Sequence, residues 1–173
     1  LFSLSFSQTT LLTETFDSTS ISNTSLNALG YSNHNSVGWT SDVLYFHNNA
    51  AHSGCNSSAD WTETNSQDAY YGTAPSGMTG YRAGIKSQYG CEHSQNLITK
   101  YWTAGQSSMA ISFSYSYRHY SGGSFKVVVQ TRSGGNSGAW FDSATLVNKT
   151  STASVDYSTN FNTTAGHHYR LVF

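Results

Sequence analysis

The stretch from Ser108 to Arg132 constrains the fold most, because its side chains alternate in kind along almost its whole length. Alternation with a period of two is typical of strands that bury one face and expose the other. The polar turn Ser121-Gly122-Gly123-Ser124 divides the stretch into two such segments, and we therefore predict an antiparallel β-hairpin here. The predicted inward face comprises Met109, Ile111, Phe113, Tyr115, Tyr117, Phe125, Val127 and Val129.

Shorter segments of the same kind occur throughout the chain, and no segment has the period of a helix. Turn residues separate them, which is typical of an all-β protein, and we predict an antiparallel β-sandwich of the jelly-roll type. The polar segments 17–27 and 47–76 are expected to be loops. The expected strands outside the hairpin are 10–16, 38–40, 44–46, 81–85, 96–103, 140–141, 146–147, 155–157 and 169–173.

Charged residues make up only 10% of the 173 residues, against roughly 25% in an average soluble protein. Eight Lys and Arg oppose nine Asp and Glu, and the basic residues are scattered singly. This distribution argues against a nucleic-acid-binding surface and against an anionic membrane surface as partner. No apolar run approaches the length of about 20 residues needed to span a bilayer, so membrane insertion is not expected.

The two ends of the sequence predict a piece of a longer, secreted protein. Residues 1–8 alternate Leu and Phe with Ser, which is typical of the end of a signal peptide, although a first strand gives the same pattern. Residues 9–173 are expected to form one jelly-roll domain. The segment His167–Phe173 alternates like a strand in mid-course, so we expect the domain to continue beyond it.

Cys55 and Cys91 lie in segments rich in Gly and Ser. Together with the hydroxyl-rich composition, they predict one disulfide in an extracellular protein. The alternative is a zinc site, because His52 and His93 lie close to the two cysteines in sequence. The tight CxxC spacing that marks such sites is missing, and two free thiols are the third possibility.

The order of several short motifs resembles the MAM-like and cleaved-adhesin jelly rolls of secreted and cell-surface proteins, including bacterial adhesins. The resemblance covers nearly all of residues 10–173 and implies a non-catalytic module for adhesion or carbohydrate contact. It also implies a glycan or a cell-surface protein as partner, and fusion to further domains. The motifs that carry it are Glu14-Thr15-Phe16-Asp17, Gly38-Trp39, Asp60-Trp61, Gly80-Tyr81-Arg82-Ala83, Asn96-Leu97-Ile98-Thr99, Ile111-Ser112-Phe113-Ser114-Tyr115 and the closing segment 166–173.

Jelly rolls of this kind often hold a structural cation, and the resemblance places a calcium site at Glu14, Asp17 and Asp60. Calcium prefers six or more oxygen ligands, and carboxylates supply some of them. The Asp-rich loop of adhesin modules is replaced here by Asn and His before Trp61. The alternative is that Asp17 caps a turn while Glu14 is solvated.

The acidic residues do not favour catalysis. Glycosidases need two carboxylates about 5 to 9 Å apart across a cleft, and no predicted strand carries such a pair. No nucleophile elbow and no HExxH spacing accompanies the seven His residues. We therefore expect a protein that is not an enzyme, with an accessory domain of a secreted peptidase or glycosidase as the alternative.

Aromatic residues in polar surroundings are candidates for stacking on sugar rings, because Tyr and Trp combine a flat apolar face with a polar group. Burial in the core is the competing interpretation, and it suits Trp39 and Trp102, which border predicted strands. The candidates for the ligand site are Trp61, Tyr70, Tyr71, Tyr117, Arg118, Tyr120 and Trp140. The same Tyr, Ser, Gly and Asn content also suits a module for protein adhesion or assembly, and the sequence leaves the two possibilities open.

Overall fold

The structure is a computed structural model, and it describes part of the chain. Backbone and side chains are described for residues 73–78, 96–119, 122–134 and 138–173. Five further strands, which lie between Ser22 and Gly84, are described by their backbone alone. The same holds for Gln95, the first residue of the strand Gln95–Thr99. Residues 1–8, the predicted strand 10–16 and the two cysteines lie outside the described residues.

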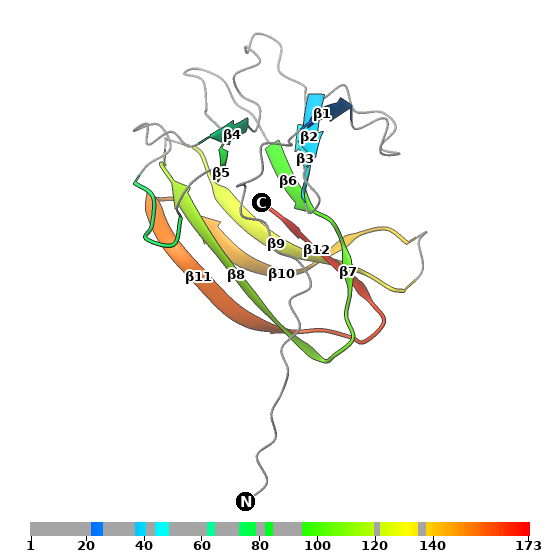
Figure 1. Cartoon of the computed structure of the whole chain (residues 1–173). Coiled ribbons are helices and arrows are strands. Elements are labelled where there is room, and N and C mark those ends of the chain that lie inside the picture. The colour runs from blue at the N-terminus through cyan, green and yellow to red at the C-terminus, as the bar shows by residue number, and fades with distance from the viewer. Residues whose placement is uncertain are drawn as a thin grey trace, which may run out of the picture.

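The described residues form strands and no helix, and the sheets are antiparallel, as the sequence predicts. The largest sheet has the order β1-β2-β3-β6-β12-β9-β10, and β7 also pairs with β12. Two further sheets have two strands each, β8 with β11 and β4 with β5 (Figure 1). The strands are β1 Ser22–Ser25, β2 Val37–Thr40, β3 Leu44–Asn48, β4 Thr62–Thr64, β5 Arg82–Gly84, β6 Gln95–Thr99, β7 Trp102–Thr103, β8 Ser108–Tyr117, β9 Phe125–Arg132, β10 Phe141–Lys149, β11 Ala153–Asn162 and β12 His168–Val172.

The pair β8–β11 is the longest regular ladder, running from Ser108 opposite Asn162 to Tyr117 opposite Ala153. Along β11, half-buried and exposed residues alternate without interruption. Because successive side chains point to opposite faces of a strand, this register brings the apolar residues of both strands, except the exposed Ala110, to one face. The other face carries Ser, Asn and Asp side chains.

The apolar face of β8–β11 packs against one face of the sheet formed by β12, β9 and β10, and the core lies between them (Figure 1). Val127 and Val129 in the middle of β9 are fully buried. The remaining buried members of this core are Trp102, Ala104, Ile111, Tyr115, Val147, Tyr169 and Leu171. These side chains exclude water from the space between the two layers, which is the main favourable contribution to folding.

Aromatic rings from both layers meet across this core. The rings of Phe113 on β8 and Phe173 lie 5.2 Å apart edge to face, and those of Tyr115 and Phe125 lie 5.1 Å apart. Such pairs contribute about 0.5–1.5 kcal/mol each beyond the area they bury. Trp102 is buried against Tyr169, which confirms its prediction as a core residue.

The predicted hairpin between Ser108 and Arg132 is wrong in its pairing, although its faces are correct. β8 pairs with β11, whereas β9 lies between β12 and β10 and has no edge left for β8. The connection is longer than a tight turn, and it carries the chain from one sheet to the other. Gly122 in this connection has a φ of 81°, a conformation that glycine adopts at little cost.

Two expected loops contain short strands. β1 lies in the polar segment 17–27 and pairs with β2, and β4 lies in the segment 47–76 and pairs with β5. Both β1 and β4 consist of polar residues, so no alternation of apolar with polar side chains indicates a strand there. Strand pairing here depends on backbone hydrogen bonds, which every residue except proline can donate.

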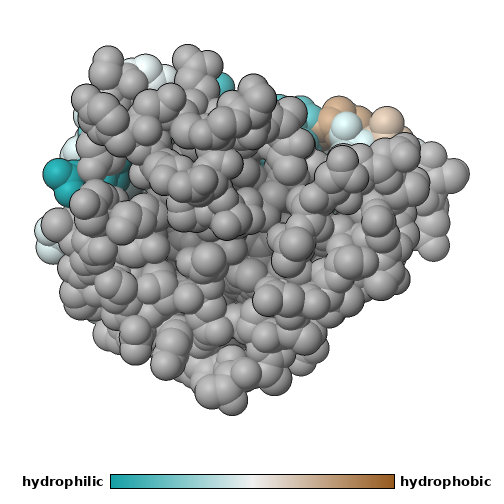
Figure 2. Space-filling model, turned by 90° about the horizontal axis from the view of Figure 1, so that it is seen from above, coloured by the Kyte–Doolittle hydropathy of each residue, from teal (hydrophilic) through white to brown (hydrophobic). Residues whose placement is uncertain are grey.

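The described part of the surface carries both hydrophilic and hydrophobic residues. Seen from above, a small hydrophobic group lies beside hydrophilic residues at the rim of the molecule (Figure 2). Among the residues whose side chains the structure describes, two large hydrophobic side chains are well exposed, Tyr101 at 46% and Phe141 at 56%. Tyr side chains are enriched at interfaces because they combine an apolar ring with a polar group, and Tyr101 belongs to the site described below.

The core arrangement predicts a difference between neighbouring valines of β9. Val127→Ala removes a fully buried side chain and should lower the free energy of unfolding by about 2–3 kcal/mol, because a cavity forms in the core. Val128→Ala changes the same residue type on the outer face, where Val128 is half-buried, and should cost less than about 1 kcal/mol. Urea denaturation measures both, and equal losses would contradict the assignment of faces.

Candidate functional site

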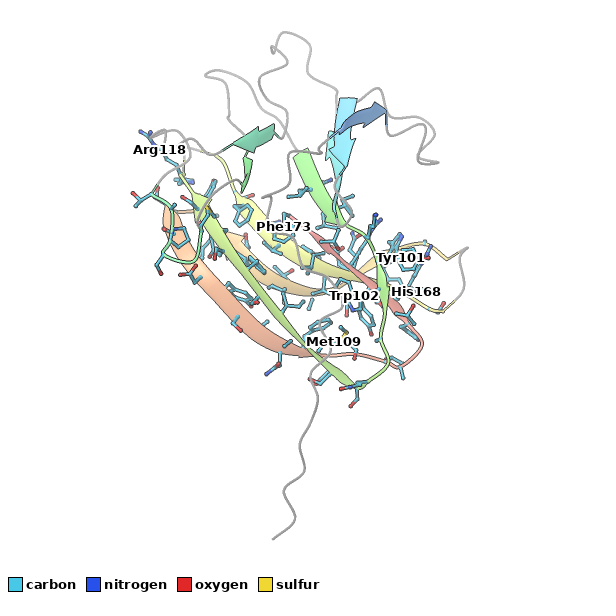
Figure 3. The ribbon with its side chains drawn as sticks, in the orientation of Figure 1. Tyr101, Trp102, Met109, Arg118, His168 and Phe173 are labelled. Atoms are coloured by element: carbon cyan, nitrogen blue, oxygen red, sulfur yellow. The ribbon has the colours of Figure 1, made fainter. Side chains whose placement is uncertain are left out.

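A group of aromatic and cationic side chains lies on the face of the β12–β9–β10 sheet that points away from the core. We call it the outer cluster. Tyr101 and His168, which belong to it, lie together at one end of the sheet (Figure 3). Its members come from β9, β12 and the residues beside β7 and β10, and they are Tyr101, Gln130, Arg132, Trp140, His168 and Arg170.

Strand register brings the polar members of the outer cluster together. Arg132 on β9 lies directly opposite His168 on β12, and Gln130 lies opposite Arg170. The residue between Gln130 and Arg132 is the buried Thr131, so the pleat turns both polar side chains to the outer face. Directly opposite residues in an antiparallel pair have Cβ atoms about 5 Å apart, and side chains from the two strands therefore meet.

Two guanidinium groups lie over one indole ring. The Cζ atom of Arg132 is 4.6 Å from the centroid of the Trp140 ring, and that of Arg170 is 4.3 Å from it. Arg132 also lies 5.0 Å from the centroid of the Tyr101 ring. Cations at such distances are attracted by the negative face of an aromatic ring, with about 0.5–1 kcal/mol for each exposed contact. Trp140 thus holds both arginine side chains in one place.

Hydrogen bonds fix the orientation of Arg170. Its Nε–H donates to Oε1 of Gln130 at 2.9 Å, and the Nε2 group of Gln130 donates to Oδ1 of Asp142 at 2.9 Å. Asp142 lies opposite Gln130 in the β9–β10 ladder. A charge-assisted bond to a planar guanidinium restricts its rotation, so this chain of contacts sets the plane of the Arg170 group.

Tyr101 forms the exposed side of the outer cluster. Its ring meets that of His168 edge to face at 4.8 Å and lies 6.2 Å from that of Trp140. Nδ1 of His168 shares a hydrogen bond of 3.0 Å with Oγ1 of Thr103, which holds the imidazole beside the tyrosine. Nearly half of the Tyr101 surface is exposed to solvent, so a flat ligand has access to it.

The outer cluster is therefore suited to binding. It offers an accessible aromatic ring, two permanent positive charges and an amide, all held on a sheet whose other face is the core. Ring stacking and planar hydrogen-bond donors on a rigid support are the elements from which sites for small polar ligands are built.

The sequence-predicted residues Tyr117 and Arg118 lie elsewhere. The Tyr117 ring stacks on Phe125, 5.9 Å away, and its hydroxyl shares a 3.3 Å hydrogen bond with Nδ1 of His119. Burial raises the pKa of Tyr117, as expected for a side chain at the border of the core. Arg118 is exposed and follows β8 of the other sheet, and it lies on the opposite side of the molecule from Tyr101 in Figure 3. These two residues therefore do not form one site with Trp140.

Most other predicted site residues lie outside the described residues. They are the ligand candidates Trp61, Tyr70, Tyr71 and Tyr120, the calcium candidates Glu14, Asp17 and Asp60, and the disulfide candidates Cys55 and Cys91. In the part of the chain that the structure describes, no group of three His, Cys, Asp or Glu side chains is placed to hold a metal ion.

Sequence reasoning found Trp140 but missed its partners in the outer cluster. A signal was present, because Gln130 and Arg132 occupy the polar positions of an alternating strand, and His168 and Arg170 do the same in another. The alternation assigns them to outer faces. It does not tell which strands are neighbours, and the cluster exists only because β9 and β12 pair in this register.

A second polar arrangement lies on the outer face of the β8–β11 sheet. The carboxylate of Asp156 accepts hydrogen bonds from Oγ of Ser114 at 2.6 Å, from Oγ of Ser76 at 3.0 Å and from the backbone N–H of Gly77 at 3.1 Å. A hollow of about 300 Å³ lies beside it. A Cβ atom at Gly77 would collide with this carboxylate, so the absence of a side chain lets the segment 73–78 approach the sheet.

Comparison with known proteins identifies no relative. No family model matches the chain, and neither a curated protein nor a solved structure matches it significantly.

Among the described residues, no helix has the length and hydropathy needed to cross a bilayer.

The Asp156 arrangement predicts a pH dependence of stability. The hydrogen bond from Ser114, together with those from Ser76 and Gly77, lowers the pKa of Asp156 below its ordinary value. A lowered pKa in the folded state means that the stabilisation is complete above the unfolded pKa, near pH 4. It is lost as the pH falls through the folded pKa.

Ser114→Ala should therefore reduce the stability difference between pH 6 and pH 3, measured by urea denaturation at each pH. Ser112→Ala, on the same face of the same strand, is the matched control and should keep the wild-type difference. An identical pH dependence in the wild type and in Ser114→Ala would contradict this role of the Asp156 carboxylate.

Proposed function

We propose that the chain is a non-catalytic, extracellular carbohydrate-binding module and that the outer cluster is its binding site. The observation that carries the proposal is the meeting of Tyr101, Trp140 and two arginines on one outward face. Pyranose rings present flat patches of C–H groups and a rim of hydroxyls. The C–H patches stack on an exposed aromatic ring, and the hydroxyls form hydrogen bonds with guanidinium and amide groups.

The members of the outer cluster have different roles in this proposal. Tyr101 is the platform for the sugar, because almost half of its surface is exposed. Trp140 is half-buried under two guanidinium groups, so it positions the donors of Arg132 and Arg170. The side-chain amide of Gln130 connects Arg170 to Asp142 and keeps the donor array in place.

The architecture and the composition support a module of this class. We propose that the two packed layers are a β-sandwich of the jelly-roll type, in accordance with the resemblance to MAM-like and adhesin domains. Low charge and abundant Ser, Thr, Asn and Tyr suit a secreted protein. In such a module, rigid strands support the site while the chain connects to other domains.

Removal of the platform ring gives a direct test of the function. Tyr101→Ala should weaken binding to the glycans found on an array by about tenfold or more, because a stacking contact worth about 1.4 kcal/mol is lost. Trp140→Ala should weaken binding similarly, because both arginine side chains lose their support. Isothermal titration calorimetry with the best glycan on the array measures both effects.

Phe141→Ala is the matched control for these variants. Phe141 is an exposed aromatic residue next to Trp140, but the register places it opposite the inward-facing Thr131. Its replacement should leave glycan affinity unchanged. A blank array, or a glycan affinity that none of the three substitutions alters, would contradict the proposed site. A blank array combined with binding to a cell-surface protein would favour the protein-adhesion alternative.

A further inference from the structure

We propose that two copies of this chain associate through the free edge of β11, with the two β11 strands antiparallel about a two-fold axis at Ser158. The layer formed in this way has the strand order β8-β11-β11-β8. The inference concerns the layer that does not carry the outer cluster, and it does not depend on the proposed function.

One edge of β11 has no strand beside it. In the part of the chain that the structure describes, β8 is the only partner of β11, and β11 lies at the margin of its layer (Figure 1). Just beyond the ladder, in the same register, the backbone N–H of Thr163 donates to the carbonyl of Ser107 at 2.8 Å. Hydrogen-bonded and non-hydrogen-bonded pairs alternate along an antiparallel ladder. The odd-numbered residues of β11 therefore bond to β8, and the N–H and C=O groups of the even-numbered residues point to the free edge.

The free edge of β11 lacks the features that usually protect an edge strand. Such strands are commonly short, interrupted by bulges, or guarded by lysine or proline. β11 has ten residues without Lys, Arg or Pro, and its register is regular throughout. By contrast β10, the strand at the end of the large sheet, has two register shifts and ends at Lys149. Of these two strands, β11 is therefore the one suited to pairing with another strand.

The one charged side chain of β11 is turned onto its own sheet. The carboxylate of Asp156 accepts a 2.6 Å hydrogen bond from Oγ of Ser114 on β8, and a 3.1 Å bond from the backbone N–H of Gly77. These contacts hold the charge over the β8–β11 face. Asp156 therefore does not guard the free edge.

Charge decides the register between the two copies. Two Asp156 side chains directly opposite each other would repel, because like charges in facing positions destabilise a strand pair. An axis at Ser158 places Asp156 opposite Asn160 of the second copy, and Ser158 opposite its own counterpart. The N–H and C=O groups that point outward from these residues then face each other, and each such pair exchanges two hydrogen bonds. The carbonyl of Asn160 accepts a 3.3 Å bond from the Thr159 hydroxyl and keeps a second lone pair for the partner strand.

The same register matches the side chains on the inward face. Val155 lies opposite Phe161 of the second copy, and Tyr157 lies opposite Thr159. Pairs of an aromatic with a β-branched residue are favourable across antiparallel strands. In the single chain these four side chains are only half-buried, although Val155, Tyr157 and Phe161 pack against the core. A neighbouring strand covers apolar surface that β8 and the core leave exposed, which favours association.

The interface is small, so the dimer should be weak and reversible. One pair of strands buries less surface than the roughly 1,600 Å² of a standard protein interface. We expect a dissociation constant on the order of 0.1 mM. The two-fold arrangement uses the free edge of β11 in both copies, so this contact closes at the dimer and does not propagate.

Sedimentation equilibrium of the whole chain over a range of concentrations tests the association. The average mass should rise from that of one chain at about 10 μM toward that of two chains at about 1 mM. A mass equal to one chain at every concentration would overturn the proposal.

Charged substitutions at Ser158 test the position of the axis. Ser158→Lys and Ser158→Asp each place two like charges opposite each other, and each should raise the dissociation constant about tenfold or more. An equimolar mixture of the two variants should associate again, because opposite charges then face each other. The matched control is Ser112→Lys, since Ser112 is also exposed and lies opposite Ser158 on β8, away from the free edge. It should keep the wild-type dissociation constant, and thermal unfolding shows that each variant is folded.

Amide hydrogen exchange, followed by nuclear magnetic resonance, tests the edge itself. The even-numbered amides of β11 should exchange quickly at low concentration and become protected as the dimer forms. The odd-numbered amides, which bond to β8, should be protected at both concentrations.

The remaining outcomes would each overturn a stated part of the inference. An equal loss of association in Ser112→Lys and Ser158→Lys would show a general charge effect and exclude the β11 edge. A failure of the mixed variants to associate would exclude the axis at Ser158. Slow exchange of the even-numbered amides in a monomeric sample would show that another segment of the same chain covers the edge. None of these results bears on glycan binding by the outer cluster, which lies on the other layer.

Discussion

The packing of β9 between β12 and β10 is the constraint on which the rest of the described structure depends. Val127 and Val129 on its inner face are fully buried, and they hold the large sheet against the layer of β8 and β11. Successive side chains of a strand point to opposite faces. Val128, Gln130 and Arg132 alternate with the buried residues of β9 and therefore point outward. The same register that closes the core therefore places Gln130 and Arg132 on the opposite face, next to Arg170 and His168 of β12.

This arrangement explains how charged residues are kept in the middle of a sheet. Each strand of the outer cluster is anchored by buried neighbours, Thr131 on β9 and Tyr169 with Leu171 on β12, and the outer side chains are held in place by ring contacts and hydrogen bonds. A site on strands supported by a core is positioned more precisely than one on loops. The Asp156 arrangement on the other layer uses the same principle to hold the segment 73–78.

The sequence predicted the class and the faces of the described strands but not their partners. Alternation identified the antiparallel β class and the inward side of β8 and β9, because both depend on local periodicity, and the position of Trp102 at a predicted strand favoured its burial. It could not predict that β8 pairs with β11, since any two alternating strands satisfy the same pattern. Trp140 was a candidate because it is an aromatic residue in polar surroundings. Its neighbours Arg132 and Arg170 were not candidates, because the sequence does not show which strands pair. Their meeting depends on contacts between distant segments of the chain.

The measurement that tests the account most directly is a titration of the isotopically labelled chain with the best glycan from the array, followed by nuclear magnetic resonance. The indole N–H of Trp140 and the Nε–H groups of Arg132 and Arg170 should shift as ligand is added. The indole N–H of Trp102, which donates to Sδ of Met109 inside the core at 2.9 Å, should stay in place. Shifts confined to residues away from the outer cluster, with the Trp140 and arginine signals unchanged, would contradict the claim that this face of the sheet binds the ligand.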